Sequence, residues 1–257
     1  MKTQVFTVTG TISQGREKPQ ILLTGAFLPD LGFGVRSLVT AKSAGDMITL
    51  LSCGTGIGAY KQAVGEVRAN GHTLLSVTSL CKRPRIDLSG DWLYGCGFKT
   101  GDVVIAGFGE GMITVKRLDL KALGLDARGP LKTKVHKVRL GVERKRRVPY
   151  ILFSGHWLSD IGFQTGQYAK VAYQNEMLTF ETGQKAGDIS GLRNTCHGWP
   201  QKVKIHDIPC YNGTSESFLL KGDWLLEEGF QAGDTLIILY EHERIRVKRL
   251  DINKYGV

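Results

Sequence analysis

The chain has few prolines and cysteines: of its 257 residues only seven are proline and five are cysteine, and no Cys-x-x-Cys pair occurs. An odd number of cysteines without that pair argues against a disulfide framework and against a standard zinc site. No apolar run is long enough to cross a bilayer, and residues 1–13 lack the apolar core of a signal peptide. We therefore expect a cytoplasmic protein with no membrane partner and no cofactor.

Glycine and positive charge are abundant. The 33 glycines favour short strands joined by tight turns over long helices. The apolar fraction of 42% and the charged fraction of 23% are those of a globular protein, which excludes wholesale disorder. The net charge of +10 suits a polyanion such as nucleic acid, an acidic membrane surface or an acidic partner, although it also serves solubility.

One sequence pattern occurs four times, with a period of about 65 residues. A short apolar strand leads to a glycine, an aromatic residue and a leucine, and then to Gly-Phe. The four copies of this pattern are Pro19–Phe33, Pro84–Phe98, Pro149–Phe163 and Ser217–Phe230. Such self-similarity indicates tandem structural units.

A longer period lies over the short one. Copies two and four end in the same five residues, Val115–Asp119 and Val247–Asp251, and copies one and three do not. The order is therefore A-B-A-B, with a loop signal at Gly129-Pro130 between the halves. We expect four units, at 1–62, 63–128, 129–190 and 191–257.

Each unit is predicted to contain two strands, a short helix and two further strands. In copy four, Gly222 or Asp223 can open the helix, with Trp224 in its first turns. Alternation places Ile245 and Val247 on one face of the last strand. The upstream strands are expected at Val5–Ile12, Thr73–Leu80, Lys134–Leu140 and Lys202–Ile208. A unit of this size is marginal on its own. We therefore expect a mainly β (α+β) fold in which units pair within the chain, one with two and three with four.

The full pattern is Pro-x-Ile-x-Leu-x-Gly-x-Trp-Leu-x-x-x-Gly-Phe-x-x-Gly, followed by a hairpin. Copies two to four carry the tryptophan and the last glycine, and copy one has Phe27 and Arg36 in their places. The residues that match are Trp92, Trp157, Trp224, Gly101, Gly166 and Gly233. This pattern resembles the SymE-type toxin family of the AbrB-like swapped-hairpin superfamily. The resemblance implies interleaved hairpins, binding of DNA or RNA, and a role as a toxin of the toxin–antitoxin type.

The candidate binding site is a cationic run. Between residues 132 and 147 there are eight Lys or Arg and one acid, Glu143, and a shorter run stands at the same place in copy two. Such groups neutralise phosphates and release counterions; the alternative is a solvated face. The predicted nucleic-acid contacts are Lys82, Arg83, Arg85, Lys132, Lys134, Lys137, Arg139, Arg144, Lys145, Arg146 and Arg147.

Other motifs in the sequence give weaker indications of a functional site. Gly54–Ala59 matches a dinucleotide fingerprint, but no acidic residue follows at the required distance, and we interpret it as a linker. The spacing of Cys196, His197, His206 and Cys210 fits no standard zinc site. The six histidines occupy unrelated repeat positions, and no Cys/His arrangement is evident. The recurring Asp91, Asp102, Asp223 and Asp234 have the positions of caps and turns.

These observations predict a nucleic-acid-binding protein that contacts mainly phosphates. Two alternatives remain open. One is an RNA endonuclease, which follows from the family resemblance alone and for which no catalytic residues can be named. The other is a scaffold whose duplicated units bind protein. The tryptophans are expected to lie in the core, and further oligomerisation is left open.

Overall fold

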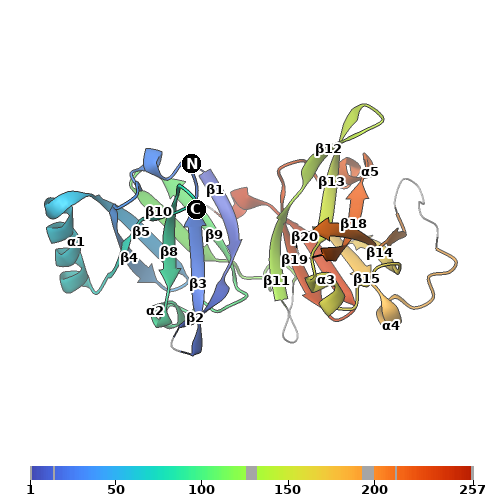
Figure 1. Cartoon of the computed structure of the whole chain (residues 1–257), viewed down its shortest axis with the longest axis horizontal. Coiled ribbons are helices and arrows are strands. Elements are labelled where there is room, and N and C mark those ends of the chain that lie inside the picture. The colour runs from blue at the N-terminus through green and yellow to red at the C-terminus, as the bar shows by residue number, and fades with distance from the viewer. Residues whose placement is uncertain (1, 14, 126–131, 193–199, 212, 256–257) are drawn as a thin grey trace. The chain divides into compact units, whose positions relative to one another are not determined.

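The structure, a computed structural model, describes residues 2–13, 15–125, 132–192, 200–211 and 213–255 (Figure 1). It is mainly β, with four antiparallel sheets. The chain separates into two compact units: the first comprises the residues up to Gly124 together with Tyr255, and the second runs from Leu125 to Lys254. The predicted loop at Gly129-Pro130 lies outside the described residues.

The elements of the first unit follow the repeat pattern. Its strands are β1 (Lys2–Thr7), β2 (Thr9–Ser13), β3 (Arg16–Thr24), β4 (Leu38–Ala44), β5 (Met47–Gly54), β6 (Thr73–Ser76), β7 (Thr78–Leu80), β8 (Arg83–Ser89), β9 (Val103–Gly109) and β10 (Met112–Arg117). Its helices are η1 (Pro29–Leu31), α1 (Gly56–Asn70) and α2 (Asp91–Gly95).

The second unit repeats this order. Its strands are β11 (Lys132–Lys137), β12 (Arg139–Glu143), β13 (Arg146–Ser154), β14 (Tyr168–Gln174), β15 (Met177–Glu181), β16 (Lys202–Lys204), β17 (His206–Cys210), β18 (Gly213–Lys221), β19 (Thr235–Glu241) and β20 (Arg244–Leu250). The helices are α3 (Trp157–Asp160), α4 (Gly183–Ala186), α5 (Trp224–Glu227) and η2 (Ile252–Tyr255).

Both units interleave two sequence copies. In the first unit the sheet orders are β1-β9-β10-β5-β4-β6 and β2-β3-β8-β7. Each order is symmetric: a strand of one copy and the equivalent strand of the other copy lie at equal distances from the two ends of the sheet. The first strand of copy one, β1, pairs with β9 of copy two, and β6 of copy two pairs with β4 of copy one. The second unit has the same two orders, so the interleaved pairing expected from the repeat is present in both halves.

One contact occurs in all four copies and joins each copy to the partner copy with which its strands interleave. Between the two upstream strands lies a buried apolar residue, which exchanges two backbone hydrogen bonds with the later turn of the partner copy. For Val138, its N–H donates to Asp234 and its carbonyl accepts from Gly233. The corresponding residues are Val8, Val77 and Ile205, all with relative exposure of 2% or less. The last glycine of the motif is therefore a docking point for the partner copy.

Copy one departs from the pattern at this turn. Arg36 donates its N–H to Val77 and adopts φ 73°, a left-handed conformation close to the φ of 86° at Gly166 in copy three. Left-handed backbone costs a residue with a Cβ roughly 1–2 kcal/mol, a cost that glycine avoids. Copy one therefore keeps the turn at an energetic cost.

Arg36→Gly should raise the free energy of unfolding by roughly 0.5–1 kcal/mol, because the strain at φ 73° disappears while glycine loses more chain entropy on folding. Gly166→Ala is the matched opposite change. A Cβ there meets no atom within 4 Å, so the expected loss of about 1–2 kcal/mol comes from backbone strain alone. Urea denaturation of both variants measures the two effects. Equal stability of Gly166→Ala and the parent would show that the turn is unstrained.

The core is built from the leucine and phenylalanine of the motif. Leu28, Leu93, Leu158 and Leu225 are fully buried, as are Phe33, Phe98, Phe163 and Phe230 at relative exposures of 0–1%. Of the three tryptophans of the motif, Trp224 is buried, whereas Trp92 and Trp157 pack partly exposed against the cores, as Phe27 does. Each indole Nε1–H donates to the carbonyl three residues earlier, on Ser89, Ser154 or Lys221. The expected burial of Trp92 and Trp157 in the core is wrong, because both rings are partly exposed although buried Trp224 makes the same hydrogen bond.

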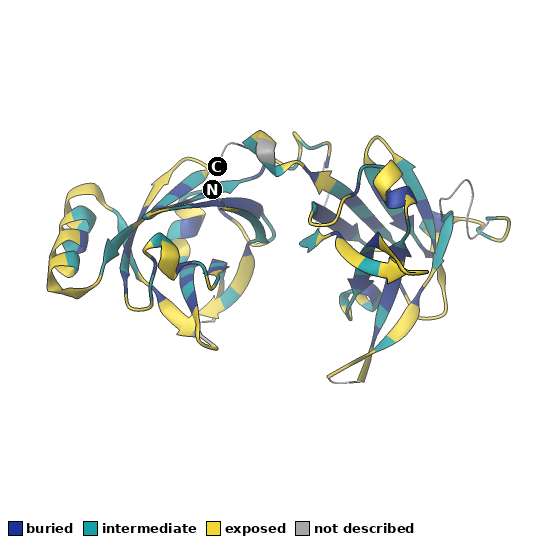
Figure 2. Ribbon diagram, turned by 90° about the horizontal axis from the view of Figure 1, so that it is seen from above, coloured by how far each residue is buried: buried dark blue, intermediate teal, exposed yellow. Residues whose placement is uncertain are grey.

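The segment interpreted as a linker forms the longest helix. Gly54 ends β5, and α1 (Gly56–Asn70) is followed by Gly71 in a left-handed conformation. Only Ala63 of this helix is buried, and in Figure 2 most of α1 is exposed. The strand–turn–helix order resembles a dinucleotide site, but β5 pairs antiparallel with both β4 and β10. Dinucleotide sites need a parallel β-α-β unit, so the topology argues against that function.

Candidate functional site

The cationic run divides between two sheets. Lys132–Lys137 form β11, the edge strand of a six-stranded sheet, and Arg139–Glu143 form β12, the edge strand of a four-stranded sheet. Arg144 and Lys145 make the turn to β13, both with left-handed φ of 45° and 68°. The last four cations therefore surround a hairpin turn at the end of a two-stranded ribbon.

We call Arg144, Lys145, Arg146 and Arg147 the cationic tip. All four are exposed, and within the described residues their side chains make no hydrogen bond or ion pair. Lys132, Lys137 and Arg139 of the same run are exposed as well. Cations without internal partners remain available to phosphates, and two guanidinium groups beside one another favour bidentate contacts.

Lys134 differs from the rest of the run. Its Nζ lies 4.5 Å from the centroid of the Trp157 ring and 5.9 Å from that of Tyr240. Burial lowers the pKa of its ammonium group, because the charged form loses hydration. This lysine is half-buried against aromatic rings, unlike the exposed cations of the run.

The shorter run of copy two has a similar division. Lys82 lies at the β7–β8 turn with φ 64°, and it and Arg83 are exposed. Arg85 instead forms an ion pair with Asp87, whose carboxylate also accepts two hydrogen bonds from Gln20. Its Nε is buried without a partner in the described part of the chain. Arg85 is thus a structural residue of the sheet, and Lys82 and Arg83 are the exposed pair.

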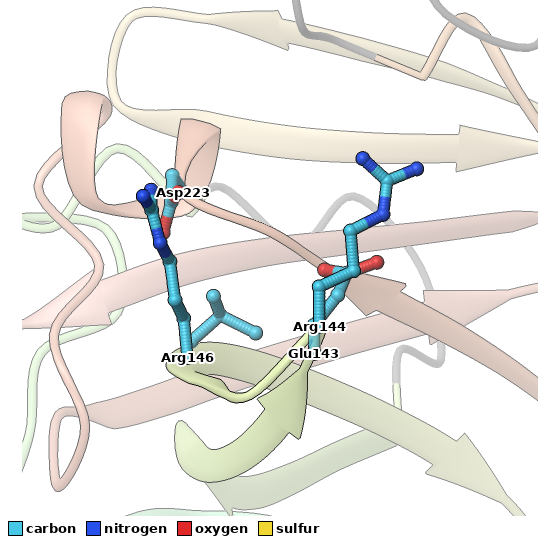
Figure 3. A pocket seen from close by; sticks show the side chains of 5 residues that line it. Glu143, Arg144, Arg146 and Asp223 are labelled. Carbon is cyan, nitrogen blue, oxygen red and sulfur yellow. The ribbon is translucent and has the colours of Figure 1, made fainter.

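A polar pocket of about 600 Å³ adjoins the cationic tip. It is lined by Glu143, Arg144, Arg146, Val148 and Asp223 (Figure 3). Arg146 extends beside Asp223, which comes from copy four, and Arg144 and Glu143 lie on the other side. None of these charged side chains forms an ion pair within the described residues. The hairpin of copy three and the helix start of copy four thus build one open site.

The same exchange brings a hairpin of one copy to the helix start of its partner at two other places. In the first unit, Lys18 Nζ lies 2.9 Å from Asp91 Oδ2. In the second, Cys210 Sγ lies 3.9 Å from His156 Nε2. Sequence spacing does not reveal the Cys210–His156 pair, because the two residues belong to different copies. Only an alignment of the repeats could have suggested it.

The Cys210–His156 pair is not a developed nucleophile site. Both residues are exposed, and among the described residues no carboxylate binds the imidazole to orient it. His206 and Cys210 share β17, whereas Cys196 and His197 lie outside the described residues. Across the described part of the chain, no group of three or more His, Cys, Asp or Glu is arranged to hold a metal ion.

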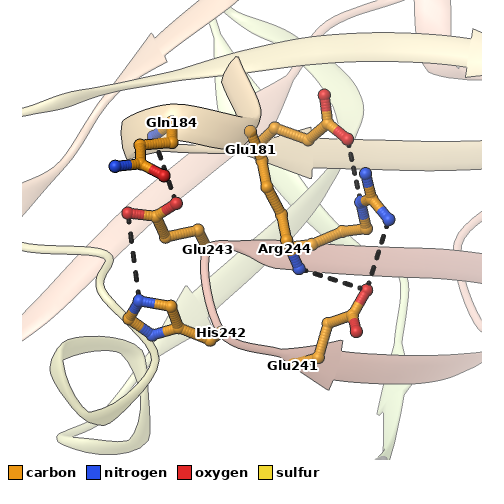
Figure 4. Close-up of polar contacts among 7 residues, drawn as sticks. Glu181, Gln184, Glu241, His242, Glu243 and Arg244 are labelled. Carbon is orange, nitrogen blue, oxygen red and sulfur yellow. Dashed lines mark hydrogen bonds and ion pairs between the residues drawn. The ribbon is translucent and has the colours of Figure 1, made fainter. Parts of the chain in front are cut away.

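A cluster of carboxylates at the β19–β20 turn is internally satisfied (Figure 4). Arg244 pairs with Glu181 at 2.8 Å and with Glu241 at 3.4 Å. The Glu243 carboxylate accepts the Gln184 N–H at 3.1 Å, and Lys185 pairs with Glu241. With these carboxylates already bound to cations or backbone, the cluster fastens α4 to the hairpin and leaves no free pair for acid–base chemistry.

The recurring Val-Lys-Arg-Leu-Asp ending is structural too. Arg117 Nη1 donates to the Gly97 carbonyl at 2.9 Å and lies 3.9 Å from Asp102. Arg249 makes the same two contacts, with Gly229 and Asp234. Burial raises the pKa of Asp102 although a backbone N–H and Arg117 oppose the shift. Asp102 and Asp234 therefore serve turns, as their positions indicated. The expected capping role of Asp91 and Asp223 is wrong, because neither α2 nor α5 has a side-chain capping hydrogen bond.

No protein-family model, curated protein or solved structure matches this chain. The described residues contain no helix long and apolar enough to cross a membrane. The function must therefore be inferred from the chemistry of the site.

Proposed function

We propose that this protein binds nucleic acid, and that the cationic tip of the β12–β13 hairpin holds the phosphate backbone. The observation that supports this best is the exposure of four adjacent cations that have no partner within the described residues. Holding four like charges together around one turn is unfavourable unless an anion neutralises them. A phosphate backbone supplies such anions at regular spacing.

The remaining exposed cations extend this surface. Lys132, Lys137 and Arg139 belong to the same unit, and the net charge of +10 attracts a polyanion at long range. Phosphate contacts position the ligand and do not read its sequence. The protein is thus a sequence-tolerant binder in which affinity depends strongly on salt.

The resemblance of the repeat motif to the SymE-type toxin family supports the same assignment, because that family implies action on nucleic acid. Membership of the family, a toxin role and a cytoplasmic location are parts of this proposal. An RNA endonuclease activity would need groups that the described residues do not gather, apart from the exposed Cys210–His156 pair. A protein scaffold would leave the cationic tip without a ligand.

The test is binding of labelled single-stranded and duplex DNA and RNA, measured by fluorescence anisotropy between about 50 and 200 mM salt. We expect affinity to fall by about 10³-fold or more over this range if six or more phosphates are contacted. The same samples, followed over time on gels, report cleavage. Affinity that is absent, or no steeper in salt than that of an unrelated protein of equal charge, would contradict the proposal and favour a scaffold.

A further inference from the structure

The β12–β13 hairpin carries an exposed apolar face beside its cations. Leu140 and Val142 alternate along β12, so their side chains share one face of the ribbon. They are 49% and 66% exposed. In the strand register Val142 lies opposite Arg147, and Glu143 lies opposite Arg146. One face of the ribbon thus presents Leu140, Val142 and Arg147, and the other presents Glu143 and Arg146.

This apolar face has no structural explanation within its unit. The core residues of β13, such as Ile151 and Phe153, lie further along the strand and are fully buried without help from Val142. An apolar edge strand is an aggregation hazard unless something covers it. Here the cations that surround it determine what kind of partner can do so.

The equivalent hairpin of the first unit provides an internal comparison. Ile12 occupies the place of Val142 on β2 and is 82% exposed, but it lies opposite Glu17 where Val142 lies opposite Arg147. The neighbouring Lys18 is bound to Asp91. The apolar position is therefore shared by both hairpins. The first hairpin has one exposed cation without a partner in the described residues, Arg16, whereas the β12–β13 hairpin has the four of the cationic tip.

We infer that the β12–β13 hairpin enters the major groove of duplex DNA and that Val142 contacts thymine methyl groups there. This inference rests on the proposed nucleic-acid binding and adds the groove and the chemical group that is read. The major groove of B-form DNA, about 12 Å wide, admits a two-stranded ribbon and exposes the thymine methyl. The major groove of A-form RNA is too narrow for side chains to read, and uracil lacks the methyl group.

The distribution of charge favours a groove over a flat anionic surface. Arg147 projects on the face of Val142, and Arg146 projects on the opposite face. A ribbon inside a groove has a phosphate strand on each side and can satisfy both. A bilayer presents its headgroups in one plane, which would leave the arginine on the opposite face of the ribbon unpaired.

The experiment compares two duplexes of one alternating sequence, one with thymine and one with deoxyuridine in its place. The full-length parent should bind the thymine duplex about fourfold more tightly for each methyl group that it buries. Val142→Ser should abolish this difference and keep the salt dependence, because the cationic tip is unchanged. Ile12→Ser, the matched control, should retain the difference. Unchanged melting temperatures of both variants confirm their folds.

The outcomes separate this inference from the proposed function. Equal affinity of the parent for both duplexes overturns the groove contact and leaves phosphate binding intact. Absence of binding to any nucleic acid overturns the proposed function itself. Duplex RNA bound as tightly as duplex DNA would also overturn the inference. So would vesicles of phosphatidylserine that bind the parent but not Val142→Ser, because the apolar face would then belong to a membrane contact.

Discussion

Alanine substitution of all four residues of the cationic tip should flatten the plot of log affinity against log salt by about three to four units on duplex DNA. Each phosphate contact that is lost removes about 0.9 units of slope, and the four side chains are exposed and unpaired in the described structure. The loss should be similar for all sequences, because phosphate contacts do not read bases. Anisotropy titrations at several salt concentrations measure the slope.

A control of equal charge distinguishes a local contact from a general effect of net charge. It replaces four exposed cations of the first unit by alanine: Lys42, Lys61, Arg68 and Lys121. Both quadruple variants remove the same charge from a chain of net +10. Equal slopes for the two variants would show that the tip is only a solvated face. The melting temperature of the tip variant should hardly change, since exposed substitutions shift stability by about 0.5 kcal/mol or less.

Phe163→Ala should destabilise the second unit by about 3–5 kcal/mol. The ring is fully buried and stacks near Phe218 at a centroid distance of 5.9 Å, so its removal leaves a cavity between copies three and four. Trp157→Ala in the same copy should cost less, about 1–3 kcal/mol, because that ring is partly exposed and loses one hydrogen bond. Guanidinium denaturation followed by circular dichroism measures both losses.

The comparison of these two variants tests the assignment of the core. Phe98→Ala, the equivalent change in the first unit, should be similarly severe because Phe98 is fully buried in a separate core cluster. If Trp157→Ala were more destabilising than Phe163→Ala, the tryptophan would be the principal core residue of the motif. That outcome would support the expectation from the sequence that the tryptophans lie in the core.

Much of the fold follows from the sequence because it depends on local patterns. The spacing of Gly90, Gly155 and Gly222 reveals the repeat, and strand alternation correctly places Ile245 and Val247 in the core, both fully buried. When one face of a strand is buried, the alternation of apolar and polar residues determines which side chains point into the core. The mainly β class and the pairing of copies follow for the same reason: one copy is too small to bury its own apolar face.

The location of the site required the tertiary structure. Arg85 and Lys134 look like their neighbours in the sequence, but Asp87 binds the first and the ring of Trp157 lies beneath the second. The pocket beside the cationic tip likewise needs Asp223 from another copy. A sequence pattern specifies residue types and faces, whereas the partner of a side chain depends on which distant strand the exchange brings beside it. The repeat therefore determined the units and their cores, and only the interleaving of copies decided which cations remain free to bind an anion.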